Sequence, residues 1–237
     1  MNKKLIWLGL AVVFIGVLFF IKQQFSEDAS WKSWNLPLSG KIIYIDAGHG
    51  GPDGGAVGGD LIEKDITLQI AKMLRDFLQE QGALVLMTRE EDKDLADSNT
   101  SGYSSRKIED LKNRVDMINE SEAELFVSIH MNALPSKKWS GAQTFYHGKY
   151  EENIHLAKFV QDELRKSLEN TTRTARPIEG VFIMKYTNKP GALVEAGFLS
   201  NPEEAKLLGE KQYQEKVAAS IYRGILRYFT SEDAPPD

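Results

Sequence analysis

Short apolar segments alternate with amphipathic helical segments from residue 41 almost to the end of this chain. In the first helical segment Ile66, Ile70 and Leu74 recur at helical spacing and share one face. Strands that alternate with helices predict an α/β domain whose central, mostly parallel sheet is flanked by helices. We expect strands at 41–46, 84–88, 125–130, 143–147, 181–184 and 192–195, and helices at 66–81, 108–119, 152–168 and 213–228.

The N-terminus carries an uninterrupted run of 17 apolar or glycine residues at 5–21. At a rise of about 1.5 Å per residue a helix of this length covers roughly 25 Å, close to the ~30 Å hydrocarbon core of a membrane. A cleaved signal peptide is the alternative, but the small residues of a cleavage site do not follow the run. An uncleaved signal anchor is therefore favoured, with Lys3 and Lys4 on the cytoplasmic side.

This interpretation divides the chain into four parts. We expect a transmembrane anchor at 1–25, a linker at 26–40, one catalytic domain at 41–230 and an acidic tail at 231–237. The domain would lie outside the cytoplasm, held to the membrane by the N-terminal segment.

Composition excludes several classes of function. A formal net charge of -5 provides no broad basic surface, which argues against nucleic acid as a partner. Cysteine is absent, and this rules out disulfides, thiolate metal sites and cysteine nucleophiles. Any metal ion must therefore be held by histidines and carboxylates.

Two of the four histidines follow predicted strands. His49 lies in a glycine-rich segment after the first strand, where glycines allow a sharp turn, and His130 ends the strand at 125–130. A single histidine at a strand end is usually structural. Two of them at the carboxyl ends of strands in one sheet indicate a common site, because sites gather at that edge.

Two glutamates complete this candidate site. Glu63 opens the first helix, where an acid is favourable by about 0.3 to 1 kcal/mol without any function. Glu195 ends an apolar strand, where lost hydration is costly unless a cation or a function stabilises the charge. Two imidazoles and one carboxylate, with water in the fourth position, are typical of catalytic zinc, and a second carboxylate then serves as the base. The residues alone leave open which glutamate is the ligand.

Five motifs resemble those of the zinc-dependent N-acetylmuramoyl-L-alanine amidases, which cut the amide between N-acetylmuramic acid and L-alanine in peptidoglycan. The motifs occur in the family's order, with its approximate spacing, between residues 41 and 229. The resemblance implies that His49, Glu63 and His130 bind Zn²⁺ and that Glu195 is catalytic. The five motifs are Ile45-Asp-Ala-Gly-His-Gly-Gly-Pro-Asp-Gly-Gly55, Glu63-Lys-Asp65, Met87-Thr-Arg89, Val127-Ser-Ile-His-Met-Asn-Ala133 and Val194-Glu-Ala-Gly-Phe-Leu-Ser-Asn201.

Within this family the chain most resembles the germination-specific amidases of spore-forming bacteria. The short N-terminal anchor, Trp31 and Trp34, and the segments 137–143 and 221–229 carry this likeness. It implies a role in maturation of the spore cortex, where stem peptides are removed so that a peptidoglycan deacetylase can help to form muramic-δ-lactam.

Weaker candidates and two rival functions remain. Asn132 and Arg114 are candidates for contact with substrate, although Arg114 could equally pair with an acidic side chain. One rival is a zinc peptidase that cuts within the stem peptide, since the metal chemistry is the same. The other is a membrane-bound protein that binds peptidoglycan without cleaving it.

Overall fold

The computed structural model describes residues 7, 14–17, 36–231, 233 and 235. Residues 37–237 form one compact unit. Most of the predicted anchor, the linker up to residue 35 and part of the acidic tail lie outside the described residues. Among the residues that are described, no helix has the length and apolar character needed to cross a membrane.

Six strands of the described chain form one sheet in the order β4-β1-β5-β8-β6-β7. Neighbouring strands are parallel except that β6 is antiparallel to β8, so the sheet is mostly parallel as expected. A short antiparallel hairpin of β2 and β3 lies outside this sheet. The strands are β1 (Ile42–Ala47), β2 (Val57–Gly58), β3 (Leu61–Ile62), β4 (Leu84–Met87), β5 (Leu125–Asn132), β6 (Gln143–Tyr146), β7 (Arg176–Pro177) and β8 (Gly191–Phe198).

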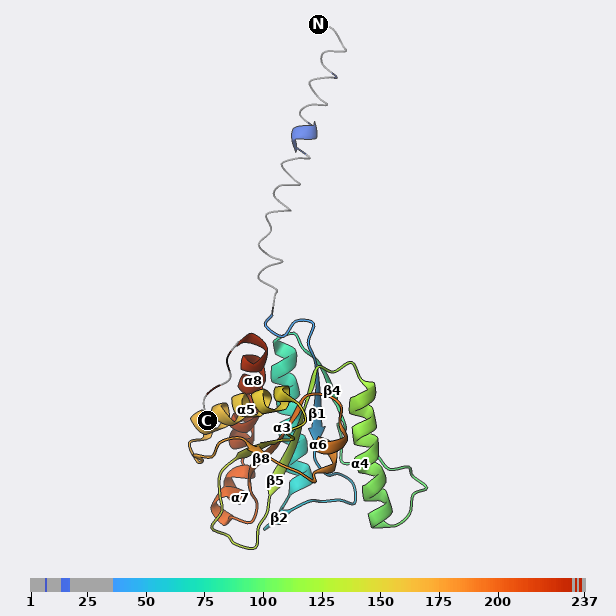
Figure 1. The fold of residues 1–237 in the computed structure, drawn as a ribbon, viewed down its shortest axis with the longest axis vertical. Helices are drawn as coiled ribbons and strands as arrows, with labels where there is room; N and C mark the ends of the chain where they lie inside the picture. Colours follow the sequence, from blue (N-terminus) through green and yellow to red (C-terminus); the bar gives the residue numbers. More distant parts are fainter. Residues whose placement is uncertain (1–6, 8–13, 18–35, 232, 234, 236–237) are drawn as a thin grey trace. The chain divides into compact units, whose positions relative to one another are not determined.

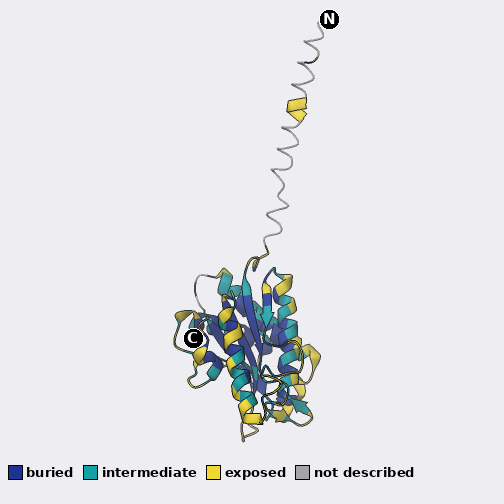
Figure 2. Ribbon diagram, turned by 90° about the vertical axis from the view of Figure 1, so that its right-hand side faces the viewer, coloured by how far each residue is buried: buried dark blue, intermediate teal, exposed yellow. Residues whose placement is uncertain are grey.

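Helices cover both faces of the sheet (Figure 1). The helices are α3 (Glu63–Glu80), α4 (Tyr103–Glu120), α5 (Glu151–Leu168), α6 (Phe182–Tyr186), α7 (Pro202–Leu208) and α8 (Lys211–Thr230). Residues of α3, α5 and α8 share the larger apolar cluster with one face of the sheet, whereas α4 and α6 share the smaller cluster with the other. Figure 2 shows the result, with buried strands inside and exposed positions on the outer sides of the helices.

Alternation along the three central strands directs the candidate site residues to one face. Tyr44, Phe126 and Leu193, one from each of β1, β5 and β8, belong to the cluster under α4 and α6. Successive side chains of a strand point to opposite faces, so residues an even number of positions further on share that face. The α4/α6 face at the carboxyl ends of these strands therefore carries Asp46, Ser128, His130 and Glu195.

One predicted strand is wrong. The segment 181–184 contributes to helix α6 instead, and its Ile183 and Met184 are both buried in the smaller cluster. A short apolar run does not by its period distinguish a strand from a buried helical turn. Helix α7 and the β2–β3 hairpin were not predicted. Asn201 caps α7, since its side chain accepts hydrogen bonds from the backbone of Glu203 and Glu204.

Candidate metal centre

Three side chains from separate elements converge at the carboxyl edge of the sheet. His130 Nδ1 lies 3.2 Å from His49 Nε2 and 3.1 Å from Glu63 Oε1. His49 Nε2 lies 3.2 Å from the same oxygen of Glu63. One ligand atom from each residue falls within 4.8 Å of the other two, which suits a single shared ion. The predicted ligand residues are therefore brought together.

The loop after β1 turns His49 toward this point. His49 has a φ of 62°, in the left-handed region that few residues other than glycine adopt. The preceding Gly48 has no room for a side chain, because a Cβ there would overlap the ring of His130. The glycine-rich motif thus serves to bring the two imidazoles close together.

Glu63 is fixed by the backbone on both sides of its carboxylate. Oε1 accepts a hydrogen bond from Met131 N at 2.8 Å, and Oε2 accepts one from Ala56 N at 2.7 Å. Burial opposes its charge, but hydrogen bonds with the imidazoles of His130 and His49 hold the pKa of Glu63 well below its usual range. Of the two glutamates left open by the sequence, Glu63 is the one in the ligand group, in the charged form that a metal binds.

Glu195 lies beside this group without joining it. It is the register partner of His130 on the adjacent strand β8, and its buried Oε2 has no hydrogen-bond partner among the described residues. Burial raises the pKa of Glu195 to about 7; the charge of Glu63 also raises it, while His130 and His49 lower it. A carboxyl group that titrates near neutral pH suits general acid–base catalysis.

This shift predicts how the activity depends on pH. Because the ionised carboxylate accepts the proton, kcat/KM should fall as the pH drops through the pKa of Glu195. A nearby cation favours the carboxylate, so we expect the acid limb between about pH 5 and pH 7. A kcat/KM profile at constant metal occupancy tests this; a rate that stays flat down to about pH 5 would contradict it.

Asp53 supports His49 from behind, a role that sequence analysis missed. Its Oδ2 lies 2.9 Å from His49 Nδ1 and 3.1 Å from the ammonium of Lys107. Its Oδ1 accepts hydrogen bonds from the Tyr103 hydroxyl at 3.0 Å and from Gly55 N at 3.2 Å. A carboxylate bound to the second nitrogen of a ligating histidine fixes the tautomer and orientation of its ring. An acid four residues after His49 in the same loop was the available signal.

Asp53→Asn should weaken metal binding. Loss of such an outer partner usually costs about 10 to 100-fold in metal affinity, and we expect a loss in this range. Competition with a chromophoric chelator measures it. Asp60→Asn, at an exposed position of the β2–β3 hairpin, is the control and should bind metal as the wild type does.

Arg114 takes part in a buried network of hydrogen bonds and ion pairs beneath the loop that carries His49. Its guanidinium, only 2% exposed, contacts Asp46 Oδ1 at 2.7 Å and Asp110 Oδ2 at 2.8 Å. It also donates to the backbone carbonyls of Ala47 and His49. The structure thus shows the alternative pairing of Arg114 with acidic side chains, through which it supports the loop that carries His49, and a contact of Arg114 with substrate stays a prediction. The backbone carbonyl of Asn132 accepts from Leu199 N, and a substrate contact by its side chain stays a prediction.

Arg114→Met should therefore destabilise the fold. Removing the guanidinium leaves the buried Asp46 with hydrogen bonds from Thr88 and Ser128 but without its cationic partner, and breaking a buried ion pair costs about 3 to 5 kcal/mol in free energy of unfolding. Denaturant unfolding measures the change, and Lys112→Met on the exposed side of α4 should stay within about 0.5 kcal/mol of the wild type. A variant of normal stability with a raised KM would instead support the substrate contact.

The fold and this group of residues define a class. Nitrogen and oxygen ligands at the carboxyl edge of an α/β sheet, beside a half-buried glutamate whose pKa is raised to about 7, are typical of a metal-dependent hydrolase. Residues 43–227 match the family described as N-acetylmuramoyl-L-alanine amidase, and the chain belongs to this family. It is thus an N-acetylmuramoyl-L-alanine amidase, as its motifs predicted.

Individual proteins similar to this chain are also amidases. The chain is 65% identical to the germination-specific N-acetylmuramoyl-L-alanine amidase of Bacillus subtilis over the full length of both chains. It is 34% identical to the amidase LytC of the same organism, over 81% of this chain and 36% of LytC. The CwlD amidase of Clostridioides difficile, solved in complex with the GerS lipoprotein, is similar in structure, with a TM-score of 0.79, 41% identity, and coverage of 81% of this chain and all of that one.

Proposed function

We propose that this amidase uses zinc to remove stem peptides from spore-cortex peptidoglycan, in preparation for germination. The observation that carries the chemistry is the convergence of His49, Glu63 and His130 beside Glu195. The biological role is supported by the identity of 65% over the full length to a germination-specific amidase.

Zinc fits the residues that would hold it. Two imidazole nitrogens and one carboxylate oxygen, without thiolates, are a common ligand set of catalytic zinc. The side chains of His49 and His130 are 17% and 22% exposed, which leaves one side of the ligand group open to substrate and water. Bound there, zinc would lower the pKa of its water toward about 7 and polarise the amide carbonyl.

The chain's own residues supply the proton transfers. Glu195, with a pKa raised by burial to about 7, accepts a proton from the attacking water and later gives it to the departing amine of L-alanine. Glu63 is held in the ionised form that binds a metal by the backbone N–H groups of Met131 and Ala56, which donate to its two oxygens. Asp53 keeps the Nδ1 atom of His49 engaged, so that Nε2 faces the ligand group.

The products of digestion test the activity and its rivals. Full-length protein purified in detergent with Zn²⁺ should release peptides with new L-alanine N-termini from muropeptides, as seen by mass spectrometry. New ends at D-amino acids would favour the peptidase, and binding without cleavage would favour the non-catalytic protein. Glu195→Gln is the control for a contaminating hydrolase.

The proposed role in the spore depends on location and on a second enzyme. We place the domain outside the cytoplasm, tethered by the apolar run at 5–21, so that the enzyme stays near its insoluble substrate. A peptidoglycan deacetylase then acts on the glycan freed of peptide to complete muramic-δ-lactam. Muropeptide profiles of spores that lack this chain should show no muramic-δ-lactam, and lactam at normal levels would contradict the role.

Removal of residues 1–25 tests the tether. The truncated protein should be lost from the membrane fraction.

A further inference from the structure

A cavity of about 190 Å³ opens between α4 and α6 next to the metal ligands. His49 and His130 line it together with the apolar side chains of Leu111, Val181 and Phe182. It lies on the α4/α6 face of the sheet, the face toward which Glu195 also points. A substrate held at the ligand group therefore has this cavity directly beside its reacting bond.

The size of the cavity limits what enters it. A volume of 190 Å³ is below the ~300 Å³ at which pockets for larger organic ligands begin. It suits a small apolar side chain and a short polar group rather than a sugar. A separate cavity of about 730 Å³, lined by the β2–β3 hairpin and by residues that follow β5 and β8, has room for a larger group.

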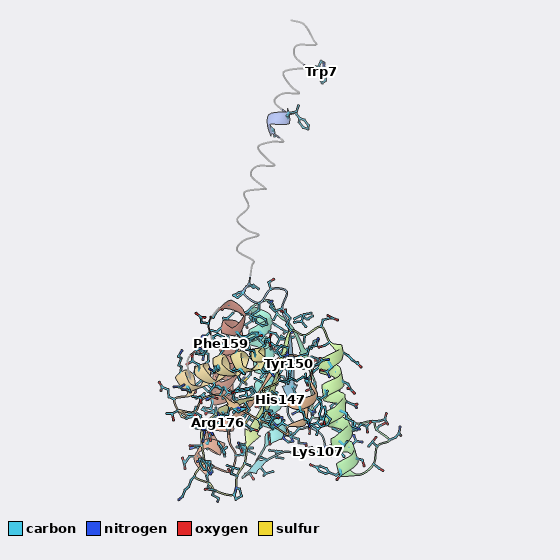
Figure 3. All side chains as sticks on the ribbon, in the orientation of Figure 1. Trp7, Lys107, His147, Tyr150, Phe159 and Arg176 are labelled. Atoms are coloured by element: carbon cyan, nitrogen blue, oxygen red, sulfur yellow. The ribbon has the colours of Figure 1, made fainter. Side chains whose placement is uncertain are left out.

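Lys107 gives the small cavity its accessible positive charge. Of the other charged side chains in its lining, Asp46, Asp110 and Arg114 are nearly inaccessible and bound to one another, and Asp53 contacts Lys107 itself. Lys107, on α4 (labelled in Figure 3), has a side chain that is 41% exposed and an ammonium 3.1 Å from Asp53 Oδ2. An ammonium has three hydrogen-bond donors, so donors remain for an anionic ligand.

We propose that the α4–α6 cavity receives the first two residues of the stem peptide, and that Lys107 binds the free α-carboxylate of the second. This assignment rests on the proposed amidase function. In peptidoglycan the first residue is L-alanine, whose methyl group fits the apolar wall, and the second is D-glutamate joined through its γ-carboxyl. The chain thereby selects peptides that carry a carboxylate at this position over those that carry a carboxamide.

The reach from the metal ligands to Lys107 agrees with this placement. Two extended residues span about 7 Å, which is the scale on which the D-glutamate carboxylate lies from the cleaved amide. The ammonium of Lys107 and Nδ1 of His49 contact the same oxygen of Asp53, so Lys107 lies just outside the ligand group. Burial disfavours its charge, but the hydrogen bond with Asp53 raises the pKa of Lys107, and the side chain is cationic at neutral pH.

A matched pair of substrates tests the proposal. The pair consists of synthetic disaccharide tripeptides that are identical except for D-glutamate or D-isoglutamine at the second position. We expect the zinc-loaded full-length protein to prefer the D-glutamate member by about tenfold in kcat/KM, mainly through KM, since a charged hydrogen bond at a partly solvated site lies at the low end of its range. Lys107→Met should reduce this preference to about one.

The ratio between the two substrates separates recognition from metal binding. Lys107 contacts Asp53, which supports the metal ligand His49, so Lys107→Met could also weaken metal binding. A loss of metal lowers the cleavage of both substrates equally and does not change the ratio between them. Lys112→Met, which removes the same charge from the outer side of α4, should keep the preference. Equal cleavage of the pair by the wild type would overturn the proposed role of Lys107, and so would a preference that survives Lys107→Met. Either result would leave the proposed amidase function standing. Failure to cleave either member would overturn the proposed function with it.

Discussion

Glu195→Gln should lower muropeptide hydrolysis by about 10² to 10⁴-fold, the range of general acid–base catalysis, while the bound metal remains. The amide has nearly the shape of the carboxyl group but neither accepts the proton of the attacking water nor protonates the departing amine. Glu195 lies outside the ligand group and its buried Oε2 has no partner in the described structure, so the substitution leaves the three ligands in place.

Two measurements on the same sample check this expectation. Metal content by atomic spectroscopy should match the wild type, and product release by mass spectrometry should be almost absent. Glu203→Gln, at an exposed position of α7, is the matched control and should be fully active. Wild-type hydrolysis by Glu195→Gln would show that the base lies elsewhere.

His49→Ala should lose the metal itself, and the activity with it. Removing one of three protein ligands is expected to cost more than the ~10 to 100-fold in affinity that an outer partner such as Asp53 contributes. After dialysis against a chelator, the wild type should regain activity with added Zn²⁺, whereas His49→Ala should not. His155→Ala, on the exposed side of α5, is the control. A His49→Ala protein that binds zinc with unchanged affinity would remove His49 from the ligand set.

Much of this site could be predicted because its residues stand at the ends of strands. His49 and His130 follow segments whose apolar pattern identifies them as strands, and a parallel sheet brings such ends to one edge. What the pattern does not contain is the distance between side chains. The separate roles of Glu63 and Glu195 therefore required either a family resemblance or the structure, which puts only Glu63 within the ligand group.

The supporting residues were harder to predict because their partners are distant in sequence. Arg114 contacts Asp46 across 68 positions, and Lys107 and Tyr103 of α4 reach Asp53 in the loop after β1. No local period encodes such contacts. The segment at 181–184 failed for a different reason, since a few buried apolar residues satisfy a short helix as well as a strand, and packing against α4 decides between them.

The most direct test of the central claim is a crystal structure of the zinc-soaked protein with anomalous data collected at the zinc edge. We predict one strong anomalous peak, about 2.0 to 2.2 Å from His49 Nε2, His130 Nδ1 and a carboxylate oxygen of Glu63, with Glu195 near the open position. An anomalous peak elsewhere, or no peak among His49, His130 and Glu63, would contradict the assignment of this chain's active site.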